Sequence, residues 1–192
     1  MTLHEHFEAL YAADEDPWRV RAAWYEQRKR AIVLASLPQA RYHSAFEPGC
    51  GNGEMSALLA ARCDRILACD GAASAVAAAR RRLHGMAPPA VRVEQRRLPG
   101  QWPSGERFDL VVISELAYYF DAPALRDMLM RTYAMLDEGG ELAMCHYLHD
   151  FDDRVTSTAD AHALAGQLPG MVRSVRHLDR DFLLEVWQRT VS

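Results

Sequence analysis

The sequence predicts an α/β fold, with a mostly parallel β-sheet that an antiparallel hairpin closes. Strand-like and helix-like segments alternate between residues 45 and 147, the order expected when helices connect parallel strands. A glycine-rich turn at residues 49–53 joins the first of these strands to its helix. Two further strand-like runs, 171–178 and 182–189, are separated by a turn too short for a parallel connection, so they are expected to form a hairpin.

Length and composition indicate one ordinary globular domain over residues 1–192. Apolar residues make up 49% of the chain and charged residues 25%, and the formal net charge is −4. The negative balance argues against a nucleic-acid partner bound by bulk electrostatics, and no apolar run is long enough to span a membrane. Without an export signal, the four cysteines are expected to be reduced thiols in a cytoplasmic protein. No pattern indicates an oligomeric state.

Two helices are expected before the first strand. Apolar side chains recur at helical spacing in residues 3–13, and residues 24–37 form a second helical pattern, which Pro38 ends. Residues 1–40 are therefore interpreted as an N-terminal helical cap on a core of residues 41–192. The cap either covers a bound ligand or only shields one edge of the sheet.

The turn after the first strand is the feature on which the functional interpretation depends. Its glycines, Gly49, Gly51 and Gly53, can adopt positive φ and allow a ligand to approach the backbone closely. The helix that follows, at residues 55–62, offers N–H groups to a polar ligand. Glu54 occupies the place where a dinucleotide-binding fingerprint has its third glycine. A tight turn without a ligand is the simpler alternative.

A carboxylate at the end of the second strand strengthens the case for a ligand. Residues 65–70 form a short strand-like run that ends in Asp70, about twenty residues after the glycine turn. At this spacing an acidic side chain at a strand end can accept hydrogen bonds from ribose hydroxyls. The two features together favour a ligand that contains a ribose.

The remainder of the core alternates in the same way. Asp121 is expected to cap a helix that Gly139 and Gly140 end. Residues 108–113 are almost entirely apolar, as expected for a central parallel strand buried on both faces. The other predicted helices are residues 73–83 and 159–168, and the other predicted strands are residues 91–94 and 141–147.

The loop and the second strand resemble the first two motifs of the class I S-adenosylmethionine-dependent methyltransferases, in the pattern Glu47-x-Gly49-x-Gly51-x-Gly53 followed by Asp70. The order of elements also resembles that family's Rossmann-like fold, whose seven-stranded sheet ends in an antiparallel hairpin. The resemblance implies S-adenosyl-L-methionine as the cofactor. Gly49 and Gly51 would then line its methionine part, Glu47 would help to orient it, and Asp70 would bind the ribose.

Finer features are similar to the nodulation-protein-S family of small methyltransferases. Known members of that family methylate the free amine of a de-N-acetylated chitooligosaccharide. The segments that carry this resemblance are Asp16-Pro17-Trp18, Trp24-Tyr25-Glu26, Arg28-Lys29, residues 108–112, Ser114-Glu115, Tyr118-Tyr119 and residues 181–187.

One position departs from the methyltransferase pattern. After the third strand these enzymes usually carry an acidic residue beside the adenine, and Arg97 stands there. Backbone groups near Leu98 are the expected substitute. Arg28 is a candidate partner for the cofactor's carboxylate, with a surface arginine as the alternative. The predicted cofactor-binding residues are Trp18, Arg28, Glu47, Gly49, Cys50, Gly51, Asp70, Gly71, Arg97, Leu98, Ser114 and Glu115.

Catalytic and substrate-binding candidates follow the fourth and fifth strands. If the acceptor is an amine, a nearby carboxylate or imidazole must take its proton, and the candidates are Glu115 and His146. Glu115 could instead bind cofactor or cap a loop. The predicted substrate contacts are Tyr118, Tyr119, His146 and His149. Core packing is the alternative for the tyrosines and a surface position for the histidines. His162 could face the same cleft, and no metal is expected.

The sequence therefore favours an S-adenosylmethionine-dependent methyltransferase that acts on a small molecule, by N-methylation of an amino sugar or of a sugar-containing metabolite. An O-methyltransferase of a small metabolite, a nicotinamide-dependent oxidoreductase and a non-catalytic cofactor-binding protein are the alternatives. Glu54 and the closing hairpin argue against the oxidoreductase. Residues 1–40 contain Trp18 and Arg28 but no strand, so they are expected to fold over the cofactor.

Overall fold

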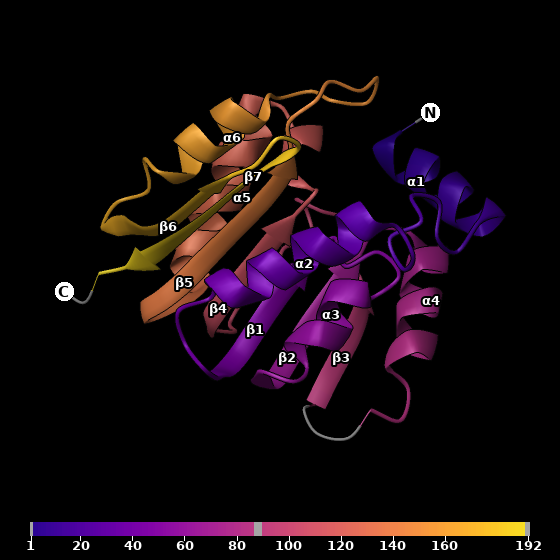
Figure 1. Ribbon diagram of the computed structural model, residues 1–192, viewed down its shortest axis with the longest axis horizontal. Coiled ribbons are helices and arrows are strands. Elements are labelled where there is room, and N and C mark those ends of the chain that lie inside the picture. Colours follow the sequence, from indigo (N-terminus) through magenta and orange to yellow (C-terminus); the bar gives the residue numbers. More distant parts are fainter. Residues whose placement is uncertain (1, 87–89, 191–192) are drawn as a thin grey trace. The chain divides into compact units, whose positions relative to one another are not determined.

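The computed structural model describes residues 2–86 and 90–190. Its internal contacts divide the chain into two compact units, Met1–Gln101 and Trp102–Ser192, and each unit combines strands with helices (Figure 1). The single domain expected from the sequence stays a prediction. No helix among the described residues is both long and apolar enough to cross a membrane.

The first unit contains a parallel sheet in the order β3-β2-β1. Because the strands are parallel, their carboxyl ends meet at one edge, where the glycine turn and Asp70 both lie. Figure 1 shows α1 beside α4, and α2 beside α3. The elements of this unit are α1 (Leu3–Ala13), α2 (Trp24–Ser36), β1 (Tyr42–Pro48), α3 (Glu54–Leu59), β2 (Cys63–Asp70), α4 (Ala73–Leu83) and β3 (Ala90–Gln95).

Small side chains allow close packing of the helices that follow β1 and β2. Helix α4 buries three alanines on one face, Ala75, Ala78 and Ala79. Gly53 lies at the start of α3 with φ +83°, and a Cβ added there would come within 3.1 Å of Ala79. A glycine at this position therefore meets two needs, a left-handed backbone and a close approach of α3 to α4.

The N-terminal helix α1 carries its own start signal and is bonded to α4. Thr2 and Glu5 form a capping box, in which each side chain accepts the other residue's N–H. Glu8 accepts hydrogen bonds from the N–H and the hydroxyl of Ser74, at 3.3 and 2.5 Å. A carboxylate of α1 thus caps the first turn of α4, which has no side-chain cap of its own at Ala72.

The second unit contains a mixed sheet in the order β4-β5-β7-β6. Strands β4 and β5 are parallel, whereas β7 pairs antiparallel with both β5 and β6. Helix α6 packs against α5, β5 and the 3-10 turn η1. The elements are β4 (Phe108–Ser114), η1 (Ala117–Tyr119), α5 (Ala122–Met135), β5 (Leu136–Tyr147), α6 (Thr158–Ala165), β6 (Met171–Leu178) and β7 (Phe182–Arg189). The predicted closing hairpin is confirmed.

One predicted boundary is wrong. Gly139 and Gly140 do not end helix α5, which stops at Met135, four residues before the first glycine; instead they lie inside β5. The pairing of β4 with β5 shifts between Phe108 and Leu110, so β5 begins at Leu136 and bulges through the two glycines. Helices α3 and α6 are also shorter than predicted, ending at Leu59 and Ala165.

Candidate functional site

In the first unit, backbone hydrogen bonds attach the glycine turn to the end of β2. The N–H groups of Gly49 and Cys50 both donate to the carbonyl oxygen of Cys69, at 2.8 and 2.9 Å. The N–H of Gly51 donates to Oδ2 of Asp70 at 3.0 Å. The turn and the predicted ribose-binding carboxylate therefore form one connected piece of structure.

Asp70 is held by backbone donors on both of its oxygens. Its Oδ1 accepts from the N–H of Ala72 at 2.9 Å, while Oδ2 accepts from Gly51. Burial raises the pKa of Asp70, and the N–H bonds from Ala72, Gly51 and Gly71 partly oppose that effect. A carboxylate has about four acceptor positions, so these N–H bonds leave it able to accept a hydroxyl group as well.

Glu47 is a second, more deeply buried carboxylate in the same unit. It is only 4% exposed, and the hydroxyl of Ser56 donates to its Oε2 at 2.5 Å. Burial raises the pKa of Glu47 to about 7, although the bond from Ser56 lowers it, and the nearby charge of Asp70 raises it further. A cationic ligand group beside Glu47 would therefore favour its ionised form.

The N-terminal helix lies directly against this part of the first unit. A Cβ added at Gly51 would collide with the hydroxyl of Tyr11, and one at Gly71 would come within 2.6 Å of His4 Nδ1. Trp18 does not occur among these neighbours; its ring packs on Tyr11, with ring centroids 5.6 Å apart. The predicted cap thus covers the glycine turn and the end of β2.

The other predicted cofactor-binding residues of the first unit differ in their exposure. Arg28 is half-buried on α2, and Arg97 is exposed, with its N–H donating to Gln101 Oε1 at 2.7 Å. Leu98 is buried. Burial, with the charges of nearby carboxylates, raises the pKa of the Cys50 thiol, so this side chain is a poor nucleophile and only its backbone suits a ligand.

These residues fit the cofactor that the sequence predicts. The turn supplies positive-φ glycines at a strand end, Asp70 supplies acceptor capacity for ribose hydroxyls, and Glu47 supplies a buried carboxylate for a cationic group. The hydroxyl of Tyr11 and the ring of His4 add polar groups to the same surface. This donor and acceptor set matches a ligand that combines a ribose with a charged amino-acid part.

In the second unit, Glu115 follows the end of β4 in an unusual conformation. Its φ is +54°, a value that non-glycine residues rarely adopt and that clusters at functional sites. Its N–H donates to the carbonyl oxygen of Cys145 at 3.0 Å. Its Oε2 accepts from the N–H of Tyr147 at 3.0 Å and from the hydroxyl of Tyr118. Two neighbouring segments therefore fix the carboxylate. Ser114, the last residue of β4, is half-buried.

Aromatic rings pack on the ring of Tyr118, whose hydroxyl binds Glu115. Tyr118 is buried and Tyr119 half-buried, with their ring centroids 4.8 Å apart, and Phe151 packs on Tyr118 at 5.0 Å. Burial, and next the charges of Glu115 and Asp153, raise the pKa of Tyr119. Tyr119 therefore stays a neutral hydroxyl group in an acidic and aromatic environment.

His146 and His149 do not share a site. His146 is fully buried, and its two ring nitrogens contact the N–H of Ala117 at 3.1 Å and His162 Nε2 at 3.0 Å. His149 is exposed and pairs with Asp181 at 3.0 Å. The position of His146 suits a supporting role better than contact with a substrate. In the residues that the structure describes, no group of three or more His, Cys, Asp or Glu side chains converges as a metal site.

One residue of the second unit that bears on the site, Glu185, was not selected from the sequence, whereas His162 was expected to be able to face the same cleft. His162 contacts Glu185 Oε2 through Nδ1 at 2.9 Å, and Arg173 donates to the other oxygen of Glu185 at 2.6 Å. Burial opposes ionisation of Glu185, but the hydrogen bond and charge of His162, with the charge of Arg173, hold its pKa below the ordinary value. Glu185 lies in a strand that is otherwise mostly apolar, and a lone acidic residue in a buried run was the available signal.

Comparison with known proteins identifies sequence relatives. Residues 45–140 match the family described as a methyltransferase domain. Nodulation protein S of Rhizobium tropici is 32% identical over 143 residues, which cover 72% of this chain and 59% of that protein. Nodulation protein S of Sinorhizobium fredii is 33% identical over 132 residues, which cover 68% and 60%. The chain thus spans about three fifths of the length of these relatives.

Solved structures agree in fold. A candidate methyltransferase from Pseudomonas syringae is 45% identical, with a TM-score of 0.76 over 87% of this chain and 100% of that one. The N-methyltransferase NodS from Bradyrhizobium japonicum, solved with S-adenosyl-L-homocysteine, is 23% identical, with a TM-score of 0.84 over 97% of each chain. The second likeness covers the predicted cap, sheet and hairpin alike. The predicted Rossmann-like fold of class I methyltransferases is confirmed.

Proposed function

The chain belongs to the family of methyltransferase domains, and we propose that it transfers a methyl group from S-adenosylmethionine to the nitrogen of a small molecule. The favoured acceptor is the free amine of an amino sugar or of a sugar-containing metabolite. The similarity to nodulation protein S supports this acceptor class, and the residues around Glu115 support an amine.

The first unit is assigned to the cofactor, which supplies the electrophilic methyl group when bound. Asp70 would accept hydrogen bonds from its ribose, and the backbone of Gly49, Cys50 and Gly51 would line its methionine part. Glu47 would face the charged amino group. Leu98 would offer backbone contacts to the adenine, because Arg97 stands where an acidic partner is common. Trp18, Arg28 and Gly71 complete the proposed contacts of this unit.

The observation that carries the acceptor assignment is the fixed carboxylate of Glu115. An amine attacks only as the free base, so a group at the site must take its proton. Glu115 can do so because Tyr118 and the N–H of Tyr147 hold one oxygen in place without neutralising the carboxylate. His146 is not given this role, since both of its ring nitrogens contact groups of the protein.

The side chains near Glu115 favour a cationic acceptor over a neutral alcohol. Tyr118, Tyr119 and Phe151 present aromatic rings, which attract ammonium groups. Glu115 and Asp153 both act electrostatically on Tyr119 and add negative charge. An amine that arrives protonated would be attracted here and could then give its proton to Glu115. His149 is kept as a proposed substrate contact in the exposed segment after β5.

The test compares two acceptors that differ in one group. Methyl transfer is measured with an amino-sugar oligosaccharide that carries one free amine and with its N-acetylated form. We expect transfer to the free amine alone, and a loss of about a hundredfold in kcat for Glu115→Gln. Glu138→Gln, an exposed glutamate on β5, is the matched control and should leave kcat unchanged. Equal transfer to both oligosaccharides, or none to either, would refute the amine assignment.

A further inference from the structure

We propose that a buried chain of His146, His162 and Glu185 is a proton-sensitive latch for the η1 turn. Adding one proton to the chain would release Ala117 from His146 and displace the pair formed by Glu115 and Tyr118. The latch concerns the second unit alone and is independent of the cofactor, whereas its effect on methyl transfer rests on the proposed function. We refer to His146, His162 and Glu185 together as the latch.

The three side chains form a continuous line of hydrogen bonds away from water. They are 0%, 3% and 4% exposed, in the order His146, His162, Glu185. The line begins at the N–H of Ala117, which lies 3.1 Å from His146 Nε2. It continues from His146 Nδ1 to His162 Nε2 at 3.0 Å, and from His162 Nδ1 to Glu185 Oε2 at 2.9 Å.

The two ends of the line determine where the histidine protons lie. The N–H of Ala117 can only donate, so His146 Nε2 must accept and the ring carries its proton on Nδ1. That proton points to His162 Nε2, which must therefore also accept. The proton of His162 then lies on Nδ1 and is donated to Glu185, whose carboxylate can only accept. With both rings neutral, every contact in the line is a hydrogen bond.

An added proton reverses this order wherever it enters the two rings. If His146 takes it, the new proton on Nε2 faces the N–H of Ala117, and two donors oppose each other. If His162 takes it, its Nε2 becomes a donor toward His146 Nδ1. Neutral His146 must then carry its own proton on Nε2, which again faces Ala117. Both routes break the same contact, the one that holds η1.

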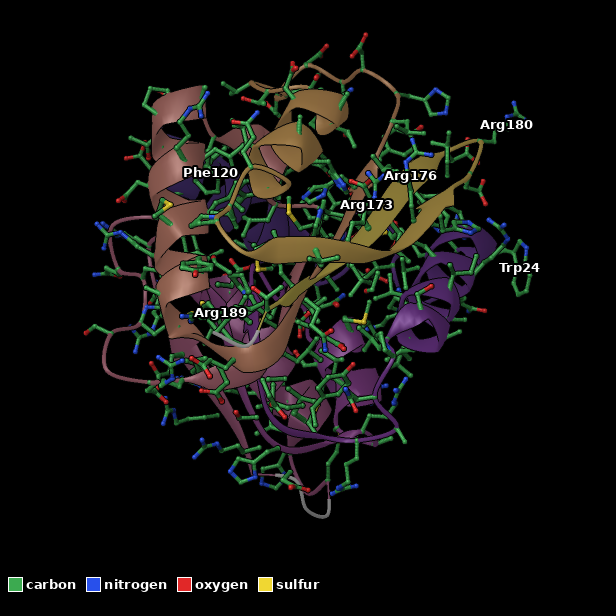
Figure 2. The ribbon with its side chains drawn as sticks, turned by 90° about the vertical axis from the view of Figure 1, so that its left-hand side faces the viewer. Trp24, Phe120, Arg173, Arg176, Arg180 and Arg189 are labelled. Carbon is green, nitrogen blue, oxygen red and sulfur yellow. The ribbon has the colours of Figure 1, made fainter. Side chains whose placement is uncertain are left out.

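Charged and aromatic side chains surround the latch. Glu185 is ionised, and it pairs with Arg173 at 2.6 Å and with Arg176 at 3.3 Å, both on β6. Figure 2 shows these two arginines on the outer hairpin. The carboxylate of Glu185 favours a positive charge on His162, whereas the arginines oppose it. At the other end, the latch meets the ring of Tyr118, 5.2 Å from that of His146, and the ring of Trp187 lies beside His162.

Release of Ala117 from His146 would affect Glu115 through a single intervening residue, Tyr118. Ala117 and Tyr118 are neighbours in η1, and the hydroxyl of Tyr118 donates to Glu115. The carbonyl oxygen of Tyr118 also accepts from the N–H groups of Val155 and Thr156, at 2.9 and 3.0 Å, so the loop after β5 is attached to the same turn. Movement of η1 would therefore alter the orientation of the carboxylate and the aromatic groups beside it. His146, His162 and Glu185 are positioning residues in this scheme.

Nuclear magnetic resonance tests the latch without any assay of activity. Long-range proton–nitrogen correlations on the histidine-labelled protein report which ring nitrogen carries the proton. At about pH 8 we expect His146 and His162 both with the proton on Nδ1. On acidification toward about pH 5, the Ala117 amide resonance should shift with the same midpoint as these rings. A proton on Nε2 of His146 at high pH, or an Ala117 resonance that does not follow the rings, would overturn the proposal.

Substitution of Glu185 separates the latch from simple packing. Glu185→Gln keeps an acceptor for His162 Nδ1 but removes the negative charge, so the midpoint should move down by about one pH unit or more. The plateau activity at high pH should stay within about threefold of wild type. Glu185→Leu removes the acceptor and should lower the plateau itself. The control His177→Gln, a histidine on β6 that pairs with Asp179, should leave the midpoint unchanged.

The two readouts distinguish failure of the latch from failure of the proposed function. If the resonances titrate together but no acceptor is methylated, the latch stands and the methyltransferase assignment falls. If methyl transfer is observed and its acid limb has the same midpoint in wild type and Glu185→Gln, the latch is refuted. An unchanged midpoint is the result that a purely structural role for Glu185 predicts.

Discussion

The two units hold their candidate site residues by different means. In the first unit, backbone N–H groups of Gly49, Cys50 and Gly51 bond to the end of β2 and to Asp70. In the second unit, side-chain hydrogen bonds hold the site residues. Tyr118 binds Glu115, and the latch connects the η1 turn, which contains Tyr118, to β5 and β7. A backbone-built loop is encoded locally and leaves a motif in the sequence. A side-chain network depends on which residues the fold brings together.

A similar contrast appears at the starts of four helices, although α1 of the first unit has a capping box of its own. Helices α5 and α6 of the second unit are capped by their own side chains, Asp121 and Ser157. Helix α3 of the first unit begins at Gly53 without a side-chain cap, and α4 receives its carboxylate from Glu8 on α1. Helix α3, which follows the glycine turn, thus begins without a side-chain cap, as expected near a ligand, whereas α4 is capped from α1.

The largest expected loss of stability comes from a substitution in the glycine turn of the first unit. Gly53→Ala places a Cβ at positive φ and within 3.1 Å of Ala79. The strained conformation and the overpacking together should lower the free energy of unfolding by about 3 kcal/mol. Gly85→Ala is the matched control, because Gly85 has φ +75° but no atom of the described residues within 4 Å of an added Cβ, and should lose about 1 kcal/mol. Urea unfolding measures both, and equal losses would show that packing against α4 contributes nothing.

The buried carboxylates of the two units should give opposite pH dependences. Glu47 has a folded-state pKa of about 7, above its ordinary value of 4.5, so its contribution to stability is complete below about pH 4.5 and lost as the pH rises through 7. Glu47→Gln keeps an acceptor for Ser56 and removes this loss. Between pH 5 and pH 8, the free energy of unfolding of Glu47→Gln, measured in urea, should rise on the order of 3 kcal/mol relative to that of wild type.

The pH dependence of stability that we expect from Glu185 has the opposite sign. Its pKa is lowered in the folded state, so its contribution to stability is present above the ordinary carboxylate value and is lost as the pH falls through the folded value. Glu185→Gln should therefore lose stability relative to wild type at neutral pH and approach it in acid. If both glutamine variants showed the same direction of change, the assignment of Glu47 as a carboxylate destabilised by burial would be wrong.

A smaller effect is expected from removing the carboxylate of Asp70. Asp70→Ala should weaken binding of S-adenosylhomocysteine by about thirtyfold, or about 2 kcal/mol, because it removes the ribose acceptor and the partner of the Gly51 N–H. Calorimetric titration measures the dissociation constant. Asp64→Ala, near the opposite end of β2 and paired with exposed Arg41, should bind as wild type does. Unchanged affinity in Asp70→Ala would remove this residue from the proposed cofactor site.

The same contrast explains what the sequence could predict. The glycine spacing and Asp70 marked the loop of the first unit, and the three-residue turn marked the hairpin, because both are local properties of the chain. Glu185 was not selected, because it lies 23 residues from His162 and its role depends on the antiparallel pairing of β7 with β5. Its one local signal was a charge in a mostly apolar run. The start of β5 was missed because a bulge accommodates Gly139 and Gly140, residues that ordinarily end a helix.

The smallest effect concerns a side-chain cap in the second unit. Asp121 accepts from the N–H of Ala124 at 2.9 Å, and its removal in Asp121→Ala should cost about 1 kcal/mol in urea unfolding. Asp127→Ala, an exposed residue of the same helix that pairs with Arg131, should cost only about 0.3 kcal/mol. Asp121→Asn should recover most of the loss, because asparagine is an equally good cap. A loss in Asp121→Asn as large as in Asp121→Ala would mean that charge, and not the capping bond, stabilises the start of α5.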